Sequence, residues 1–570
     1  MPERGSGAWD AVLEVVRQNG VRTLFGLPGD DLALLAALRR SAAPPRLVLC
    51  RDQRNALFMA TGHAVQTGTP AVAVVGKGPA VTNASTGLLE ARYSHAPVVL
   101  IGSGTGAPHR GARAFQELDQ VAAVAPLTKW AHRVEHADRL VPALRRALLV
   151  ATQGAPGPVY LEVPDHLLEA TVAVRGGGPV VSGAVRTRHE PSASQPVREA
   201  RRPILLVGGG MRHRNGARVV ERLAERIGAA IFCTASGRGA VDEDHPHFLG
   251  LSGLYAASST TSLWSTADCL ISLGSRLEET ATLGWPETIG EATPVVQVNI
   301  AGDEFAADYS GPCLTGDAAG VVEEWLADDL GTPESRAAWT REVTGARRRL
   351  RDAHREALDR FAGSGGRLRV AELLAAVQRV VPEHRVLVQE NGLQDMWSYF
   401  FPVYHCGRAG GSVVPSEQTS LGFGAAAAAG VKLAEPHRPV LALVGDGAFG
   451  LFAADLRTLV RERIGVCYLV LRNGGYGWLQ QQADQHDPPL TGFAFAGGEE
   501  PLERTPGVHH VVVERRAELD DVLAAAVAAA AGGTPGVVEV PVPLDDAALR
   551  PEGDSGTAEP WPRPETDKER

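Results

Sequence analysis

Cysteine is scarce in this sequence and shows no pairing pattern. The chain has six: Cys50, Cys233, Cys269, Cys313, Cys406 and Cys467. None of them forms a Cys-x-x-Cys or Cys-x-x-His spacing, which argues against a zinc ribbon or a disulfide framework. Five lie in or beside apolar runs or Gly-rich turns. We therefore expect buried free thiols in a reducing compartment.

Long apolar runs are also absent. No uncharged stretch approaches the ~20 residues that a membrane-spanning helix needs. The most apolar alanine run, 425–431, is short and built from small side chains. The amino terminus, MPERGSGAWD, lacks the basic and then apolar pattern of a secretion signal. These features predict a cytoplasmic protein without a membrane partner.

Basic charge is in deficit. The chain has 56 Lys and Arg against 66 Asp and Glu, a net charge of −10, with no basic stripe. This argues against nucleic acid as a partner, because phosphate binding needs a concentrated basic surface. A hydrophobic content of 44% in 570 residues is ordinary for a globular protein, and the length suggests about three or four domains.

Short Val, Ile and Leu runs recur through the chain, bounded by Gly or Pro and separated by segments of helix length. They lie at 46–50, 71–75, 98–101, 159–163, 204–207, 269–273, 295–298, 386–388, 440–444, 466–471 and 536–540. Such runs indicate parallel sheets that are buried on both faces. The predicted fold class is therefore α/β, with three doubly wound parallel-sheet domains.

Two stretches interrupt this rhythm and divide the chain. Residues 173–200 are rich in Gly, Pro, Ser and Arg, and 331–366 form a charged helix that ends in a Gly-rich hinge. We expect an N-terminal domain over 1–172, a central Rossmann-like domain over 201–330 and a C-terminal domain over 367–550. The tail, 551–570, has almost no apolar residue and is predicted to be disordered.

The sharpest motif lies in the last third. The strand-like run before Gly445-Asp446-Gly447 is followed, after the 24 residues 448–471, by Arg472-Asn473-Gly474-Gly475-Tyr476-Gly477. Both turns follow apolar strands, so both should lie at the carboxyl ends of parallel strands, where α/β sheets bind ligands. Carboxylate, amide and carbonyl oxygens suit Mg²⁺, and a helix starting near Ala448 would offer N–H groups to a diphosphate. Alone, Gly-Asp-Gly is equally typical of a tight turn.

This pair of motifs resembles the metal site of the thiamine-diphosphate enzyme superfamily. Within that superfamily, the sequence is most similar to acetolactate synthases. That metal motif is Gly-Asp-Gly followed at this spacing by two Asn. Here Arg472 replaces the first Asn, and its role is left open. The resemblance implies that Asp446, Asn473 and the backbone carbonyl of Gly475 bind Mg²⁺, and that thiamine diphosphate is the cofactor.

Further segments resemble the same family in the same order over about 520 residues. They are Leu27-Pro28-Gly29, the Gly78–Asn83 loop that lies against the pyrimidine, Phe115-Gln116-Glu117, the 389–397 segment that closes over the diphosphate, and the Gly422–Gly424 loop that supports the bent cofactor. Leu421 takes the position of the side chain that props the two rings against each other. The resemblance implies these cofactor contacts: Pro28, Gly78, Pro79, Asn391, Gly392, Leu393, Gln394, Thr419, Leu421, Gly445, Gly447, Ala448, Asn473 and Tyr476.

The residue that activates the cofactor departs from the family. Almost every relative has a Glu there, within His-Glu-Gln in acetolactate synthases, and the matching stretch is Arg51-Asp52-Gln53. Asp52 is therefore implied as a catalytic residue, about 1.5 Å shorter in reach than Glu. The alternative is that Asp52 only pairs with Arg51 or Arg54 at a strand end.

The resemblance also implies a substrate pocket. Gln116 is expected to face the substrate, and Leu479 and Gln482 lie where relatives line the pocket. Lys77 stands where relatives have a small Ser or Thr. As a third catalytic residue it would anchor an anionic substrate or tune Asp52, and the alternative is a solvent-facing lysine.

The leading functional prediction is decarboxylation of a 2-oxo acid, with or without capture of an acceptor carbonyl. One alternative is a lyase or hydrolase that cleaves a ketol or cyclic diketone, and another is a paralogue that binds the cofactor with little turnover. FAD is not expected, because Arg276-Leu277-Glu278-Glu279-Thr280 lacks the second Arg of the family's flavin-binding stretch. The family builds each site from two chains, which implies a homodimer at least and favours a homotetramer.

Overall fold

The structure is a computed structural model of the chain. It describes residues 6–29, 32–168, 170–172, 178–179, 194–213, 216–331, 333–363, 367–390, 392–407, 411–483, 486, 488, 490–495, 501–544 and 546. Most of the predicted linker 173–200 and all of the predicted tail 551–570 lie outside the described residues.

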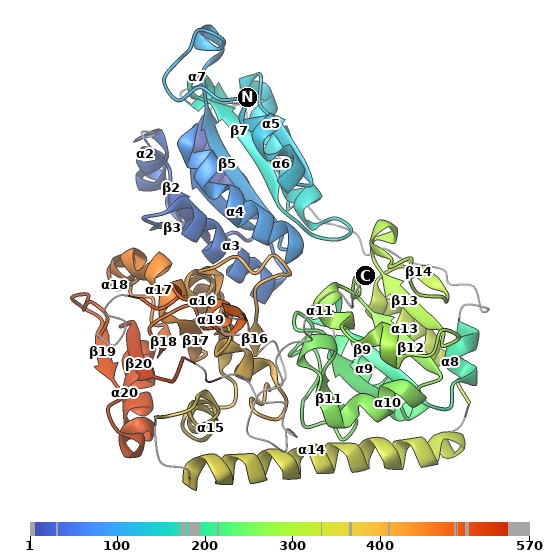
Figure 1. Cartoon of the computed structure of the whole chain (residues 1–570). Helices are drawn as coiled ribbons and strands as arrows, with labels where there is room; N and C mark the ends of the chain where they lie inside the picture. Colours follow the sequence, from blue (N-terminus) through green and yellow to red (C-terminus); the bar gives the residue numbers. More distant parts are fainter. Residues whose placement is uncertain are drawn as a thin grey trace.

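Three six-stranded sheets, each with helices on both faces, make up the described chain (Figure 1). Their strand orders are β3-β2-β4-β5-β7-β6, β11-β10-β9-β12-β13-β14 and β16-β15-β17-β18-β20-β19. Every strand pair within these sheets is parallel. The predicted α/β class is confirmed.

The strands are the short β-branched runs that the sequence contains, and their burial on both faces explains their apolar character. The first sheet contains β2 (Thr23–Leu27), β3 (Arg46–Leu49), β4 (Ala71–Val75), β5 (Val98–Gly104), β6 (Trp130–Arg133) and β7 (Val159–Pro164). A separate antiparallel pair joins β1 (Ser6–Gly7) to β8 (Thr171–Val172). The helices of this part are α1 (Ala8–Gln18), α2 (Leu32–Arg40), α3 (Gln53–Thr67), α4 (Pro79–Tyr93), α5 (Gln120–Val124), α6 (Ala137–Thr152) and α7 (Asp165–Leu168).

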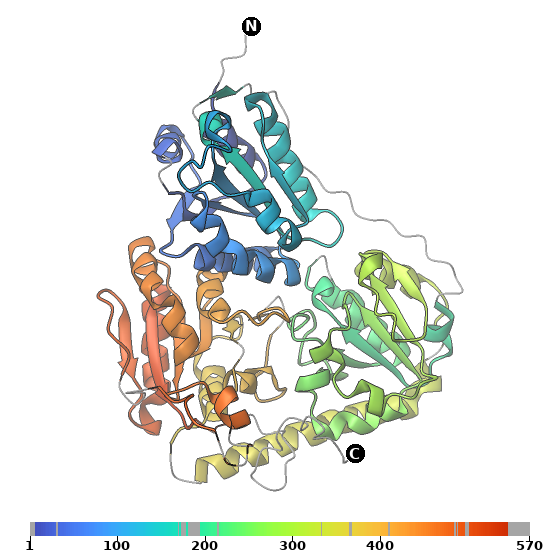
Figure 2. The same ribbon diagram turned by 45° about the horizontal axis from the view of Figure 1, so that its top comes forward.

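The other two sheets repeat the pattern. The middle one has β9 (Pro203–Val207), β10 (Ala230–Cys233), β11 (Phe248–Leu251), β12 (Cys269–Leu273), β13 (Val295–Asn299) and β14 (Cys313–Thr315), with α8 (Gln195–Glu199), α9 (Gly216–Ile227), α10 (Thr261–Thr266), α11 (Glu279–Thr282), α12 (Trp285–Thr288) and α13 (Ala318–Ala327). The last has β15 (Val386–Gln389), β16 (Ser412–Val413), β17 (Val440–Gly445), β18 (Cys467–Arg472), β19 (His509–Val512) and β20 (Gly536–Pro541), with α15 (Val370–Val380), α16 (Phe423–Ala434), α17 (Asp446–Phe452), α18 (Leu456–Glu462), α19 (Gly477–Ala483) and α20 (Leu519–Ala531). Between them, α14 (Ala337–Gly363) runs beneath both sheets (Figures 1 and 2).

The alanine run of α16 packs closely against α3, and this contact joins the first and last sheets. A Cβ on Gly430 would lie 1.8 Å from the Met59 carbonyl oxygen, so only glycine fits at this crossing. Small side chains let the two helix backbones approach. The alanine run is therefore an interdomain contact.

A buried ion pair of the middle domain contacts a segment of the last domain. Arg238 Nε lies 2.7 Å from Glu243 Oε1, and their side chains are 1% and 0% exposed. The same guanidinium donates to the backbone carbonyls of Ser398 and Tyr404. Because breaking a buried pair leaves an uncompensated charge, this contact fixes the position of the 395–404 segment.

The cysteines and the helices bear on two of the expectations. All six cysteines are free, and all but Cys313 are buried, which confirms the prediction of buried free thiols for five of them. None of the helices that the structure describes combines the length and apolarity needed to cross a bilayer.

Candidate functional site

The two turns of the sharpest motif meet around one carboxylate. Strands β17 and β18 are parallel neighbours, with Gly445 in register with Leu471. Asp446 accepts hydrogen bonds from Gly447 N through Oδ1 (2.8 Å) and from Gly474 N through Oδ2 (2.9 Å). Helix α17 begins at Asp446, two residues before the expected start near Ala448. Asp446 is thus held rigidly where the two strands end.

Asn473 and Gln394 extend this cluster. Asn473 Oδ1 accepts from Gly475 N (2.9 Å), and Asn473 Nδ2 donates to Gln394 Oε1 (2.9 Å). Gln394 in turn donates to the Leu544 carbonyl (2.7 Å). The donor set at this edge consists of a carboxylate, an amide oxygen and backbone carbonyls, which are the ligands that Mg²⁺ prefers. The residues present therefore fit a cation bound to a diphosphate.

Arg472, which stands where the family has Asn, makes a buried ion pair. Its Nε lies 3.2 Å from Glu539 Oε2 on the adjacent strand β20, and the side chains are 11% and 0% exposed. Glu539 also contacts His510 Nε2 and accepts from Leu502 N. Arg472 thus anchors the end of β18 just before Asn473. Its role, which the sequence left open, is therefore structural.

Glu539→Gln should destabilise the chain by about 3–5 kcal/mol, because it leaves the Arg472 guanidinium buried without its anion. Asp520→Asn is the matched control: its pair with Arg379 is exposed and such pairs contribute less than about 1 kcal/mol. Chemical denaturation of both variants measures the difference. A Glu539→Gln midpoint equal to that of Asp520→Asn would contradict this role.

Two buried acids beside these turns were not singled out from the sequence. Burial and the neighbouring Asp395 raise the pKa of Glu390 to about 8. Burial, with a contribution from Asp446, raises the pKa of Asp395 to about 7. Burial also raises the pKa of Asp446. Only their position beside the expected Gly392–Gln394 segment could have indicated them, because an acid's burial is not visible in a sequence. Asn391 lies outside the described residues, and Leu393 is buried.

The raised pKa of Glu390 predicts a pH effect on stability. Between about pH 4.5 and about pH 8, folded Glu390 keeps a proton that the unfolded chain has released, so stability falls as pH rises through this window. Glu390→Gln should therefore gain stability relative to wild type as pH increases from about 5 to about 8. Thermal unfolding of the cofactor-free proteins at several pH values measures this, and a constant difference across the window would refute it.

The loop before α16 has the conformation of a functional turn. Thr419 has a φ of 42°, in a region that non-glycine residues rarely adopt. Leu421 is 41% exposed, which is unusual for a large apolar side chain in this chain. Glu90 of α4, fully buried, accepts from Ser416 N (2.5 Å) and Ser420 N (3.3 Å). The loop is thus fixed from the first domain with Leu421 projecting outward.

The remaining expected residues of the last domain lie nearby. Tyr476 and Leu479 are each 41% exposed. The Tyr476 ring packs edge-on against Phe495 with centroids 4.8 Å apart. Leu479 and the exposed Gln482 are on α19, which starts directly after the Asn473 turn. Apolar side chains therefore remain available around the polar turns.

A second set of predicted residues gathers at the carboxyl ends of β2 and β4. Pro28 and Gly29 follow β2, and a Cβ on Gly29 would lie 3.2 Å from Gly76 Cα. Gly78, with φ 56°, precedes Pro79 at the start of α4, and a Cβ on it would lie 2.7 Å from the Gln116 carbonyl oxygen. The structure thus brings Pro28, Gly78, Pro79 and Gln116 together.

Gln116 and Gln120 hold this second set in shape. Gln116 is exposed and has a φ of 57°, and a strained backbone of this kind is typical of binding sites. Gln120, 1% exposed, accepts from Gly78 N (2.6 Å) and donates to Ser103 O and Tyr160 Oη. Sequence reasoning missed Gln120, because nothing in the pattern shows that its amide reaches the Gly78 loop.

Asp52 caps helix α3. Its Oδ1 accepts from Arg54 N (2.8 Å) and Asn55 N (3.3 Å), and it lies 3.9 Å from Arg54 Nε. Its side chain is 35% exposed. Buried Asp455 fixes the same turn by accepting from Arg51 N (2.8 Å) and Asn55 Nδ2 (2.9 Å). One Asp52 oxygen is thus used within the turn, and the carboxylate stays accessible.

Lys77 has a specific partner. Its Nζ lies 2.6 Å from Asp165 Oδ2, and the lysine side chain is 23% exposed. It is therefore neither a free solvent-facing lysine nor bonded to Asp52 in this structure. Among the described residues, Asp52 has no hydrogen bond or ion pair with the turns at Asp446 and Asn473, and we refer to these two sets of residues as the half-sites.

A cavity of about 370 Å³ lies between the three sheets. Its wall includes the carboxyl ends of β9 and β12 and Arg276, in the stretch that matches the family's flavin-binding segment but lacks its second Arg. Arg276 contacts Glu278, and Glu304 and Glu417 also line the cavity. Neither Asp52 nor Asp446 lines the cavity, but Thr419 of the loop before α16 does, so the cavity reaches one of the turns described above.

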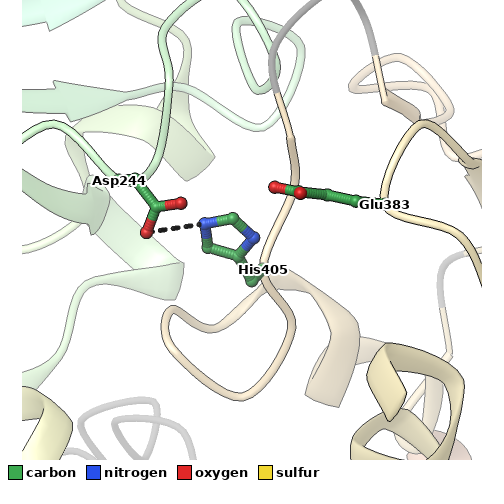
Figure 3. Close-up of side chains that lie close together, drawn as sticks. All are labelled: Asp244, Glu383 and His405. Atoms are coloured by element: carbon green, nitrogen blue, oxygen red, sulfur yellow. Dashed lines mark ion pairs between the residues drawn. The ribbon is translucent and has the colours of Figure 1, made fainter.

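A third cluster brings together Asp244, Glu383 and His405 (Figure 3). Two carboxylates and an imidazole are groups that can bind a metal ion. His405 Nε2 lies 3.3 Å from Asp244 Oδ1. However, Arg351 Nη2 lies 3.0 Å from the same Asp244 oxygen, so this carboxylate already has a cationic partner. We interpret the cluster as a contact between the middle and last domains.

The chain matches three family models in order. They are the thiamine pyrophosphate enzyme N-terminal TPP binding domain over residues 8–123, the central domain over 192–324 and the C-terminal TPP binding domain over 390–540. It is 26% identical over 485 residues to acetolactate synthase isozyme 1 large subunit of Escherichia coli, covering 84% of each chain. Isozyme 2 large subunit of the same organism is 28% identical, covering 82% of this chain and 83% of the relative. Acetolactate synthase of Mycobacterium leprae is 27% identical, covering 84% and 77%.

Proposed function

The chain belongs to the thiamine pyrophosphate enzyme family, and on this premise we propose that it decarboxylates a 2-oxo acid and transfers the remaining acyl carbon to an acceptor carbonyl. The observation that carries the proposal is the meeting of the two turns at Asp446 and Asn473 on adjacent strand ends. When bound, thiamine diphosphate supplies an electron sink beside the carbon–carbon bond that reacts.

Mg²⁺ is proposed as the cation at this edge. Asp446, Asn473 and the carbonyl of Gly475 would hold it, and the turns 392–394 and 445–448 would surround the diphosphate. Leu421 would support the bent cofactor from its exposed position. The fit is supported by the all-oxygen donor set. It is also supported by two buried carboxylate oxygens without a hydrogen-bond partner in the neighbouring segment, Glu390 Oε1 and Asp395 Oδ1.

On the first domain, Asp52 is proposed to hold a proton at the cofactor's pyrimidine ring. Its accessible carboxylate and its fixed turn support this. Gln116 is proposed to face the substrate, with Leu479 and Gln482 completing the pocket. Lys77 is paired with Asp165 and directly precedes the Gly78 loop. We propose that this position brings its positive charge close to an anionic substrate.

A homodimer is proposed as the smallest active unit, with a homotetramer built from it. Large apolar side chains are exposed in both the first and the last domain: Leu32, Leu35, Phe115, Leu118, Leu421, Leu451, Tyr476 and Leu479. Clustered exposed apolar residues mark interaction surfaces. In such a dimer, Asp52 of one chain would face Asp446 of the other.

Two further proposals concern the surroundings. We propose that the protein binds no flavin, because the cavity beside Arg276 also exposes the carboxylates of Glu278, Glu304 and Glu417 to any diphosphate. Flavin absorbance of the purified protein tests this. We also propose a cytoplasmic location, which the free cysteines support.

The function is tested by supplying 2-oxo acids, with and without aldehyde acceptors, in the presence of thiamine diphosphate and Mg²⁺. The expected result is CO₂ release, with a hydroxyketone product when an acceptor is present. Cleavage of a ketol or cyclic diketone without CO₂ would replace the proposal with a lyase or hydrolase. Cofactor binding without any turnover would instead indicate the catalytically weak paralogue.

A further inference from the structure

Asp395 places a buried carboxylate, one oxygen of which is unpartnered, beside the glycines of the two cofactor turns. It begins the short 3-10 helix η9 (Asp395–Tyr399), is 3% exposed, and its Oδ1 has no hydrogen-bond partner. Its Oδ2 lies 2.5 Å from the position of a Cβ on Gly392 and 3.9 Å from that of a Cβ on Gly445. The carboxylate is therefore close to both turns.

Among the described residues, the stabilising contact of the Asp395 carboxylate is a hydrogen bond with its own backbone N–H. It interacts unfavourably with Asp446, and no described cation forms an ion pair with it. Asp446, in contrast, accepts two backbone N–H groups. A buried carboxylate without a cationic partner is costly, and a divalent cation beside both carboxylates would offset that cost.

We propose that Asp395 is a second carboxylate of the divalent-cation site, with its free Oδ1 directed to the cation held by Asp446. The inference rests on the proposed function, since the same cation would bind the diphosphate. Two carboxylates raise the affinity for a divalent ion above what one provides. The protein therefore binds the cation before the cofactor arrives.

The neighbouring acid Glu390 has a different role. Its Oε2 accepts from Gly424 N (2.9 Å) at the start of α16, so it caps that helix. Glu390 interacts electrostatically with Asp395, and Asp395 interacts electrostatically with Asp446. Asp395 is thus the acid nearer to the cation ligands, and the two can be distinguished by substitution.

The test measures binding of Mn²⁺ alone to cation-free protein, without thiamine diphosphate, by the electron paramagnetic resonance signal of free Mn²⁺. Asp395→Asn should weaken binding about 10- to 100-fold. Glu390→Gln and the exposed Asp520→Asn should stay within about threefold of wild type, and Asp446→Asn should lose binding. Circular dichroism and thermal unfolding of Asp395→Asn verify that it folds, and if it does not, the smaller substitution Asp395→Ser is measured in its place.

The outcomes separate this inference from the proposed function. Equal Mn²⁺ affinity of wild type and folded Asp395→Asn overturns the inference and leaves the function intact. The same holds if wild type binds Mn²⁺ only after thiamine diphosphate is added. Absence of binding even with thiamine diphosphate overturns both.

Discussion

Asp446→Asn should abolish cofactor retention, lowering the affinity for Mg²⁺ with thiamine diphosphate by about 100-fold or more. The carboxylate is the one anionic group that the motif would supply to the proposed cation, and its two oxygens are oriented by Gly447 N and Gly474 N. An amide keeps one acceptor and loses the charge. Calorimetric titration of Mg²⁺ and thiamine diphosphate, followed by kcat/KM on the 2-oxo acid that the proposed screen identifies, measures the loss.

The fold should survive this change. Asn at 446 removes a carboxylate whose pKa is raised by burial, which favours the folded cofactor-free protein. It also leaves one backbone N–H without an acceptor, at a cost of about 1–3 kcal/mol. The two effects oppose each other, so thermal unfolding should shift little. Cofactor affinity within threefold of wild type would contradict the assignment of Asp446.

The half-site around Asp446 could be predicted because neighbouring parallel strands bring residues that are distant in sequence to the same edge of the sheet. Gly445 and Asn473 are far apart in the chain, but both follow strands of one parallel sheet, and neighbouring strands end at the same edge. The same reasoning fixes the fold class, since β-branched runs alternating with helices leave few arrangements. The Gly78 loop was predicted from the resemblance to the family alone.

What could not be predicted depends on side chains that meet through packing. Gln120 reaches Gly78 N only because α5 lies against α4 and β7. Arg472 pairs with Glu539 because β18 and β20 are adjacent. Lys77 pairs with Asp165, which is 88 residues away in the sequence. The buried Asp395 carboxylate lies near Gly392 and Gly445, which are distant in sequence. Such contacts have no local pattern, so a sequence offers no signal for them.

Asp52→Asn should lower kcat by about 10²- to 10⁴-fold, the usual contribution of a proton-transferring group. The structure makes Asn the decisive substitution because Asp52 also caps α3 through Arg54 N and Asn55 N. Asn caps as well as Asp does, whereas Ala costs about 0.5–2 kcal/mol. Asp52→Asn therefore removes the titratable carboxyl and keeps the helix start. Steady-state kinetics beside thermal unfolding separates the two roles.

The exposed Asp10→Asn, which removes a carboxylate paired with Arg40 in the same domain, serves as the charge control and should keep full activity. Asp52→Glu restores the family's longer side chain. If wild type is silent on every 2-oxo acid and Asp52→Glu is active, the chain is the weak paralogue. If Asp52→Asn retains wild-type kcat, Asp52 holds only the helix.

Mixing the Asp52→Asn and Asp446→Asn chains should restore activity that neither variant has alone. In a mixed dimer whose sites combine two chains, one site carries both changes and the other carries neither, so random pairing gives about a quarter of the wild-type sites. This follows from the proposed dimer, in which Asp52 of one chain faces Asp446 of the other. If both residues served one site from the same chain, every site would keep a defect. Mixtures as inactive as the separate variants, despite exchange of subunits, would therefore show that the half-sites do not meet across a dimer.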